Sequence, residues 1–125
     1  MAKVLLDTNF ILSCVRNKLD FFDELTFRGY KILIPKQVFA ELDGISRSKQ
    51  KMHSRDDAHF ALKMLEKEEK SYEEIDMGKG NVDNSIVNYS KNNKEVIIAT
   101  LDSELKKKIT SRKMVIREKK RLEVV

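Results

Sequence analysis

The sequence predicts an α/β protein in which helices cover both faces of a central parallel sheet, a three-layer α/β/α sandwich. Two short apolar runs, residues 1–6 and 96–100, end beside the aspartates Asp7 and Asp102. Buried parallel strands have this continuous apolar pattern, and open α/β sheets bind ligands at the carboxyl ends of their strands. Strand and helix patterns alternate along the chain, which favours parallel pairing through right-handed crossovers. The two aspartates therefore indicate an acidic pocket at one edge of the sheet.

The first half of the chain is expected to supply two strands and three helices. Gly29 closes the second helix, since glycine is common just after a helix end. Pro35 opens the third helix, where the N–H that proline lacks is not needed. The polar, basic stretch 44–53 is expected to be a loop. The expected bounds are a strand over 2–6, helices over 9–16 and 21–27, a strand over 30–34 and a helix over 35–42.

The second half continues the same alternation. Ser54 is expected to cap a helix with an apolar side. The segment Gly78-Lys79-Gly80 interrupts the pattern before Asn81, which is expected to cap the next helix. Residues 121–125 either add an edge strand or remain free. The expected bounds are a helix over 54–68, an edge strand over 72–77, a helix over 82–90, a strand over 96–100, a helix over 102–111 and a strand over 114–116.

Length and composition limit the class of protein. The 125 residues fit one domain, 1–125, of ordinary size. No apolar run approaches the roughly 20 residues that a membrane-spanning helix needs, and the first apolar run is too short for a signal peptide. We therefore expect a cytoplasmic protein with no membrane partner. Cys14 is the only cysteine, which excludes an intrachain disulfide and a cysteine-rich zinc site.

Basic residues are unevenly distributed in a chain whose net charge is +5. Such clusters favour a polyanionic partner, because contacts to phosphates dominate nucleic-acid affinity. Charge alone is equally compatible with solvated helix faces and a charged tail. One cluster lies within residues 106–121 and includes Lys106, Lys107 and Lys108, and another follows Glu41 and includes Arg47, Lys49, Lys51 and Arg55.

Four acids lie near expected junctions of strands and helices: Asp7, Glu41, Asp83 and Asp102. Helix capping accounts for Asp7 and Asp102 when each is taken alone. Glu41 lies at the edge of the apolar side of its helix. The simpler interpretation is that it is an ordinary surface glutamate. Asp83 shares the apolar side of its helix with Ile86, so its carboxylate needs backbone N–H groups or a metal as partner, and capping of its own helix is the alternative. The joint pattern carries more weight than any single acid.

Crowded carboxylates repel one another, so a shared site of this kind requires cations. Oxygen ligands without histidine or cysteine favour Mg²⁺ or Mn²⁺ over zinc. His53 and His59 lie far from the four junctions in the sequence. A site of this type suits hydrolysis of phosphodiester bonds, since the metal activates water and stabilises the leaving oxygen. Lys106, Lys107 and Lys108 follow Asp102 and are placed to hold a nucleic-acid backbone.

The segments that carry these acids resemble the four acidic motifs of the PIN-domain nucleases. The resemblance implies a parallel five-stranded sheet in the order 3-2-1-4-5 and a metal-dependent ribonuclease selective for single strands. It makes Asp7, Glu41, Asp83 and Asp102 the catalytic and metal-binding acids, supported by Thr8, Asn9, Thr100 and Glu104. Asn9 and Thr100 would orient ligands or water, and Glu104 would be a fifth acid if two ions bind. The matching segments are Leu5-Leu6-Asp7-Thr8-Asn9, Phe39-Ala40-Glu41-Leu42, Asn81-Val82-Asp83-Asn84-Ser85-Ile86-Val87 and Ile98-Ala99-Thr100-Leu101-Asp102-Ser103-Glu104-Leu105-Lys106.

Within that family two branches compete. The region after Asp102 looks like the archaeal stand-alone PIN proteins related to ribosomal-RNA-processing endonucleases, although Arg112-Lys113-Met114 replaces a Gly-Val/Ile-Pro turn common there. VapC-type toxins share the four acids, and a toxin would have an antitoxin partner. A non-catalytic RNA-binding module is a third alternative. The expected partners are single-stranded or structured ribosomal RNA, a second copy of the chain, and an antitoxin or ribosome-assembly protein. The expected RNA-binding residues are Lys106, Lys107, Lys108, Arg47 and Lys49.

Overall fold

The computed structural model describes residues 2–49 and 51–125. Strands and helices alternate through the described chain, as the apolar patterns predict. The elements are β1 (Lys3–Leu6), α1 (Thr8–Arg16), α2 (Phe21–Phe27), β2 (Lys31–Pro35), α3 (Lys36–Arg47), α4 (Met52–Lys67), a short 3-10 helix (Glu69–Ser71), β3 (Tyr72–Ile75), α5 (Val82–Asn92), β4 (Ile97–Ala99), α6 (Ser103–Lys108), β5 (Lys113–Arg117) and β6 (Arg121–Val124).

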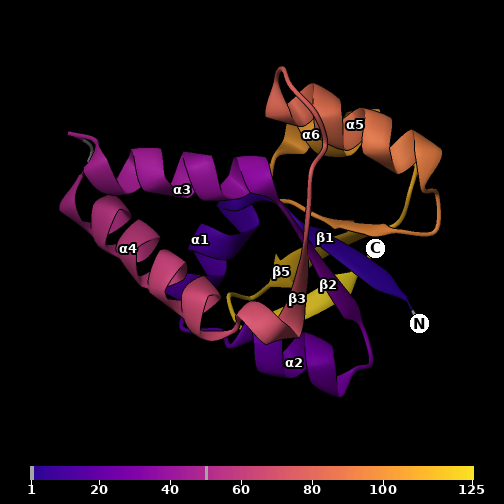
Figure 1. Ribbon diagram of the computed structural model, residues 1–125. Coiled ribbons are helices and arrows are strands. Elements are labelled where there is room, and N and C mark those ends of the chain that lie inside the picture. The colour runs from indigo at the N-terminus through magenta and orange to yellow at the C-terminus, as the bar shows by residue number, and fades with distance from the viewer. Residues whose placement is uncertain (1, 50) are drawn as a thin grey trace.

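The strands form one sheet in the order β3-β2-β1-β4-β5-β6 (Figure 1). The first five strands are parallel and follow the predicted order 3-2-1-4-5. The prediction of five strands is wrong by one, because β6 pairs with β5 as an antiparallel edge strand. A tight turn at Glu118 and Lys119, both with positive φ, lets the chain reverse between these two strands.

Alternate residues of the strands enter two separate cores, one on each face of the sheet. Val4, Ile32 and Ile97 belong to the core that α1–α4 cover. Leu5, Leu33 and Ile98 belong to the smaller core beneath α5 and α6. In Figure 1 the pair α5 and α6 lies on one side of the sheet, and α1, α3 and α4 lie on the other. The predicted three-layer sandwich is therefore confirmed.

The register of β1 with its neighbours decides which residues meet at the carboxyl edge of the sheet. Leu6 is the register partner of Ala99, and the Asp7 backbone N–H donates to the Ala99 carbonyl at 3.0 Å. Asp7 and Thr100 are therefore the first residues beyond the two central strands. On the other side of β1, the third helix α3 begins directly after Pro35, the last residue of β2. The starts of α1 and α3 consequently lie at the same edge as Thr100.

The predicted loop over 44–53 is mostly wrong. Helix α3 continues through Gly44 to Arg47. Helix α4 begins at Met52, and its N-cap is Lys51 instead of the predicted Ser54. Glycine disfavours a helix by about 1 kcal/mol, but Ile45 packs against the core beside α4 and offsets that cost. The rest of the predicted loop includes Gln50, which lies outside the described residues.

Helix α4 is amphipathic and packs against α3 and α1. Its inner side carries Ala58, Ala61 and Leu65, which are fully buried, while His53, His59 and Lys63 are exposed. None of the helices in the described ranges combines the length and the apolar character that crossing a membrane requires.

Candidate active site

Asp7 is the most buried acid at the carboxyl edge of the sheet, with 5% of its surface exposed. It caps α1, and its Oδ1 accepts a hydrogen bond from the Thr8 backbone N–H at 2.8 Å. Its Oδ2 accepts a hydrogen bond from the Thr100 hydroxyl at 2.8 Å. Capping, the simpler interpretation of Asp7, is thus confirmed. It accounts for only one of the two carboxylate oxygens.

Thr100 connects Asp7 to Asp102. The side chain of Thr100 is fully buried, and its oxygen also accepts a hydrogen bond from the Asp102 backbone N–H at 3.2 Å. Asp102 caps α6 through Oδ1, which accepts from the backbone N–H groups of Glu104 at 3.0 Å and Leu105 at 3.3 Å. Among the described residues no hydrogen bond reaches Asp102 Oδ2. That oxygen is available to a ligand.

Glu41 joins the same group of side chains from α3. Its Oε1 accepts a hydrogen bond from the Thr8 hydroxyl at 3.1 Å. Thr8 is buried at the start of α1, so it fixes the position of a glutamate whose own surface is largely exposed. Thr8 therefore holds two acids at the start of α1. Its N–H donates to Asp7 and its hydroxyl donates to Glu41.

Asp83 approaches the other acids from the opposite face of the sheet. It is exposed in the first turn of α5, where Asn81 is the N-cap as predicted. Its negative charge raises the pKa of both Asp7 and Glu41, so its carboxylate is near enough to act on each of them. The predicted core-facing position of Asp83 is wrong, because Asp83 is exposed to solvent.

Burial is the main reason that the pKa of Asp7 is raised above the ordinary value of an aspartate. The hydrogen bonds from Thr100 and Thr8 lower the pKa of Asp7, and the charges of Asp83 and Asp102 raise it again. The pKa of Glu41 is raised in the same way, first by desolvation and then by the charges of Asp7 and Asp83. The four predicted acids therefore form one electrostatically coupled group, which we call the acid cluster.

The structure places the supporting residues less uniformly. Thr8 and Thr100 are hydrogen-bonded to the acid cluster, whereas Asn9 is exposed in the first turn of α1. Glu104 is an exposed residue whose carboxylate lies 3.6 Å from the Lys107 ammonium, so it does not join the hydrogen-bonded group. The expected fifth acid is therefore turned towards a lysine in this structure.

The predicted basic residues fall into two separate places. Lys106, Lys107 and Lys108 form the end of α6, within two turns of Asp102, and the last two are exposed. Arg47 is at the far end of α3, about 9 Å along the helix from Glu41, and forms an ion pair with Asp43 at 3.1 Å. Lys49 is exposed beyond that end. The α6 lysines follow Asp102 on the helix that it caps, whereas Arg47 and Lys49 lie at the end of α3 that is remote from Glu41.

One residue beside the acid cluster was not predicted. Gln37 lies four residues before Glu41 on α3, and its Nε2 donates a hydrogen bond to the Gly78 carbonyl in the connection between β3 and α5. Its Oε1 is buried and has no hydrogen-bond partner among the described residues. The only sequence signal was the Gly78-Lys79-Gly80 segment, which predicts a break but not its partner.

The donor set of the acid cluster fits a hard divalent cation. It consists of carboxylate oxygens, and mutual repulsion leaves the carboxylates in need of positive charge. Within the described ranges no three His, Cys, Asp or Glu side chains are arranged to hold an ion among them. Mg²⁺ commonly uses only one or two carboxylates together with water and substrate phosphate, so a site for it does not require three protein ligands.

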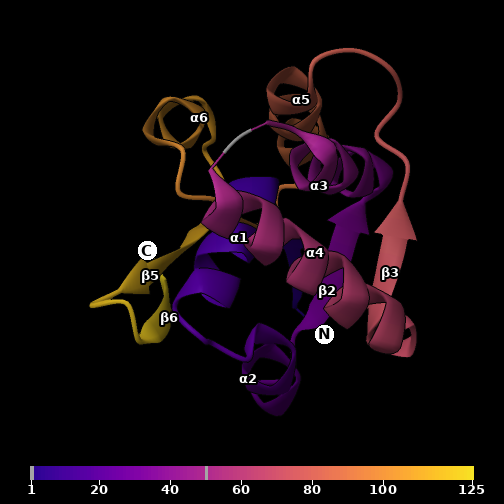
Figure 2. The same cartoon turned by 90° about the vertical axis from the view of Figure 1, so that its left-hand side faces the viewer.

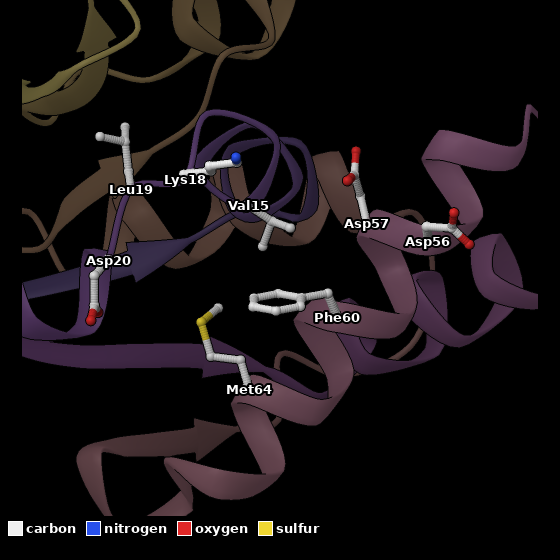
Figure 3. A pocket seen from close by; sticks show the side chains of 8 residues that line it. All are labelled: Val15, Lys18, Leu19, Asp20, Asp56, Asp57, Phe60 and Met64. Carbon is white, nitrogen blue, oxygen red and sulfur yellow. The ribbon is translucent and has the colours of Figure 1, made fainter.

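A hollow in the described surface lies elsewhere, between the end of α1 and the outer side of α4 (Figure 3). It has a volume of about 550 Å³, and Val15, Met64 and Phe60 point towards one another across it. Phe60 is 60% exposed, and Asp20 and Asp56 lie at the rim. The acid cluster does not line this hollow, which we call the α4 pocket.

Comparison with known proteins assigns the class. The sequence matches the family described as "PIN like domain" over residues 4–121. The chain therefore belongs to the PIN-like domain family, as its four acidic segments indicated. The match includes all four members of the acid cluster.

The chain is similar to one curated relative and to several solved structures. The chain is 31% identical over 131 aligned positions to Ribonuclease VapC4 of Methanocaldococcus jannaschii, covering 99% of this chain and 97% of that protein. Its structure is similar to that of the PIN domain endonuclease Utp24, with a TM-score of 0.77, 24% identity and coverage of 98% and 90%. It also resembles a chain in the VapBC2 complex of Rickettsia felis, solved with a DNA fragment from their promoter, with a TM-score of 0.58, 18% identity and coverage of 89% and 98%. The two structural likenesses show the fold.

The raised pKa of Asp7 gives a stability prediction. Because the pKa of Asp7 is raised in the folded state, ionisation of Asp7 costs more in the folded chain than in the unfolded chain. The native chain therefore loses stability as the pH rises through that pKa. The asparagine of the variant Asp7→Asn cannot ionise, so the variant does not lose stability in this way. We expect the free energy of unfolding of Asp7→Asn, relative to the native chain, to increase between about pH 4 and pH 8. Urea unfolding in EDTA measures it.

Glu66→Gln, which removes one exposed negative charge on α4, is the control for the Asp7→Asn comparison. It separates the effect of losing net charge from the effect of losing a buried carboxylate. A relative stability of Asp7→Asn that stays flat or falls as pH rises would contradict the assignment of Asp7 as a buried, destabilising charge.

Proposed function

We propose that the chain is a Mg²⁺- or Mn²⁺-dependent endoribonuclease that hydrolyses phosphodiester bonds at the acid cluster. The observation that carries the proposal is the hydrogen-bonded link from Asp102 through Thr100 to Asp7, with Glu41 attached through Thr8. The name of the M. jannaschii relative and the fold shared with a PIN domain endonuclease support ribonuclease activity. Asp7, Glu41, Asp83 and Asp102 are the proposed catalytic and metal-binding residues.

The side chains of the acid cluster have distinct proposed roles. A bound divalent ion would polarise the phosphoryl oxygen and lower the pKa of water. Asp7 is held rigidly by Thr8 and Thr100, so it fixes the position of a ligand. Glu41 has a raised pKa and an exposed carboxylate, which suits it to accept a proton from the attacking water. Asn9, which is exposed in the first turn of α1, is the proposed residue that orients water or a ligand.

The proposed RNA path passes over α6. Lys106, Lys107 and Lys108 lie directly after Asp102 and offset the negative charge that would otherwise repel a phosphate backbone. Arg47 and Lys49 would contact RNA only if it extends along α3. Ribosomal RNA processing is the proposed setting, because the region after Asp102 resembles the archaeal stand-alone PIN proteins.

Cleavage of a labelled single-stranded RNA tests this function directly. The native chain is expected to cut the RNA with Mn²⁺ and to leave it intact with EDTA. Asp7→Asn and Asp102→Asn are each expected to reduce the rate by about 100-fold or more, since each removes a negatively charged ligand oxygen. Asp23→Asn, an exposed aspartate on α2, is expected to cut at the native rate.

Cleavage that persists in EDTA, or that Asp7→Asn and Asp102→Asn leave intact, would overturn the proposed site. If folded native protein leaves every RNA uncut with Mn²⁺, the non-catalytic RNA-binding alternative replaces the enzyme.

A second candidate keeps the chemistry and changes the biology: a toxin ribonuclease held silent by an antitoxin. The α4 pocket favours it. The pocket presents apolar side chains from Val15, Phe60 and Met64 beside the carboxylates of Asp20 and Asp56. A partner segment with apolar and basic side chains would complement this surface. The VapBC2 complex and the VapC4 relative make an antitoxin the partner of choice.

Expression in a bacterial host tests the toxin alternative. A toxin would stop growth when the native chain is induced, and Asp102→Asn would not. Phe60→Asp would still stop growth, because the α4 pocket lies apart from the acid cluster. Normal growth at equal levels of native protein that is active on RNA would count against the toxin role.

A further inference from the structure

We propose that Lys79 is an RNA-backbone contact on the α3 side of the acid cluster, held there by Gln37. The proposal rests on the proposed ribonuclease function and names a substrate-positioning residue for that site. Lys79 was not among the predicted RNA-binding residues. With Lys106, Lys107 and Lys108 on α6, it would place positive charge on two sides of the four carboxylates.

The connection that carries Lys79 is fixed at three points. The Asp76 carboxylate accepts a hydrogen bond from the Gly78 N–H at 2.9 Å, and the Gln37 amide donates to the Gly78 carbonyl. Asn81 then caps α5 by accepting from the Asn84 N–H at 3.2 Å. Lys79 therefore lies between a residue with both backbone groups bonded and a helix cap.

Two glycines give this connection its shape. Gly78 has φ of +88° and Gly80 has φ of +110°, conformations that residues with a side chain rarely adopt. A Cβ at either position would meet no atom within 4 Å, so glycine is needed there for backbone conformation and not for close packing. The chain thus turns on both sides of Lys79 and leaves its side chain exposed.

Both ends of the connection lead to members of the acid cluster. Gln37 is four residues before Glu41, so their side chains are neighbours on one side of α3, about 6 Å apart. Lys79 is itself four residues before Asp83. Figure 2 shows the connection rising from β3 and entering α5 near α3. Lys79 therefore follows a residue that is bonded to α3 and precedes the helix that carries Asp83.

Electrostatics explains why a lysine is useful at this place. A phosphate backbone that approaches Asp7, Glu41, Asp83 and Asp102 is repelled unless cations flank its path. Lys79 forms no ion pair with the described residues, so its charge is available to a ligand. Lys107, in contrast, shares its charge with Glu104.

The chemistry of Gln37 supports a positioning role. Its Nε2 is bonded to Gly78, while its Oε1 is buried without a partner among the described residues. A half-satisfied buried amide contributes little to stability, because an unpaired polar atom offsets the hydrogen bond. Replacement by leucine removes both the bond and the unpaired oxygen. Gln37→Leu therefore releases the Lys79 connection with little loss of fold stability.

The test combines RNA affinity and cleavage kinetics for native protein, Lys79→Ala, Lys79→Arg, Gln37→Leu and the double variant. Lys79→Ala is expected to weaken binding of a labelled single-stranded RNA in EDTA by about five-fold. The slope of the logarithm of its RNA association constant against the logarithm of the salt concentration is expected to become shallower by roughly 0.7. With Mn²⁺, KM should rise while kcat is retained, and Lys79→Arg should behave as native.

Lys94→Ala is the matched control, since Lys94 is an exposed lysine beyond the opposite end of α5. It removes the same charge and is expected to change the affinity and the salt slope much less. Gln37→Leu should weaken binding as Lys79→Ala does, and the double variant should be no weaker than either. Melting temperatures of all variants should remain near that of the native chain.

The outcomes separate this inference from the proposed function. If the native protein cleaves RNA but Lys79→Ala keeps the native KM and salt slope, the assignment of Lys79 is overturned and the ribonuclease stands. If Gln37→Leu has no effect, or adds fully to Lys79→Ala, the positioning role of Gln37 is overturned. Native protein that neither binds nor cleaves RNA overturns the proposed function and this inference together.

Discussion

The hydrogen bond from the Thr100 hydroxyl to Asp7 Oδ2 joins two strand ends that are 93 residues apart in the chain. It depends on the parallel pairing of β1 with β4, in which Leu6 lies opposite Ala99. A shift of this register by one residue would turn Asp7 to the other face of the sheet and bury a different set of side chains. The two apolar cores therefore fix the register, and the register assembles the acid cluster.

The cost of that arrangement is a buried carboxylate beside other carboxylates. Desolvation and the charges of Asp83 and Asp102 raise the pKa of Asp7, while only Thr100 and the Thr8 N–H oppose them. A protein that keeps such a carboxylate beside other carboxylates holds a site that favours added positive charge. Divalent ions supply positive charge directly, and lysines that flank the site offset the negative charge that repels a phosphate backbone. The proposed metal site and the proposed RNA path therefore respond to the same excess of negative charge.

Much of this organisation could be predicted from particular residues. The apolar runs that end at Asp7 and Asp102 gave the two central strands and the edge of the sheet at which the acids meet. Asn81 marked a helix start correctly, and Pro35 marked one to within a residue, because both residues act locally as the N-caps of α5 and α3. Local signals of this kind do not depend on the rest of the chain.

Features decided by distant packing were not predictable in the same way. Gly44 is typical of a helix end, but α3 continues through it because Ile45 packs against the core beside α4. The prediction that Asp83 faces the core was wrong, because α5 presents that residue to solvent. The bonds of Gln37 to Gly78 and of Thr8 to Glu41 join residues 41 and 33 positions apart, and no local pattern announces them.

Crystals grown or soaked with Mn²⁺ and measured at the manganese absorption edge would test the central claim most directly. An anomalous peak within coordination distance of Asp102 and of at least one other acid of the cluster is the predicted result. A peak confined to another part of the surface, or no peak at Mn²⁺ concentrations that support RNA cleavage, would contradict a metal site at the carboxyl edge of this sheet.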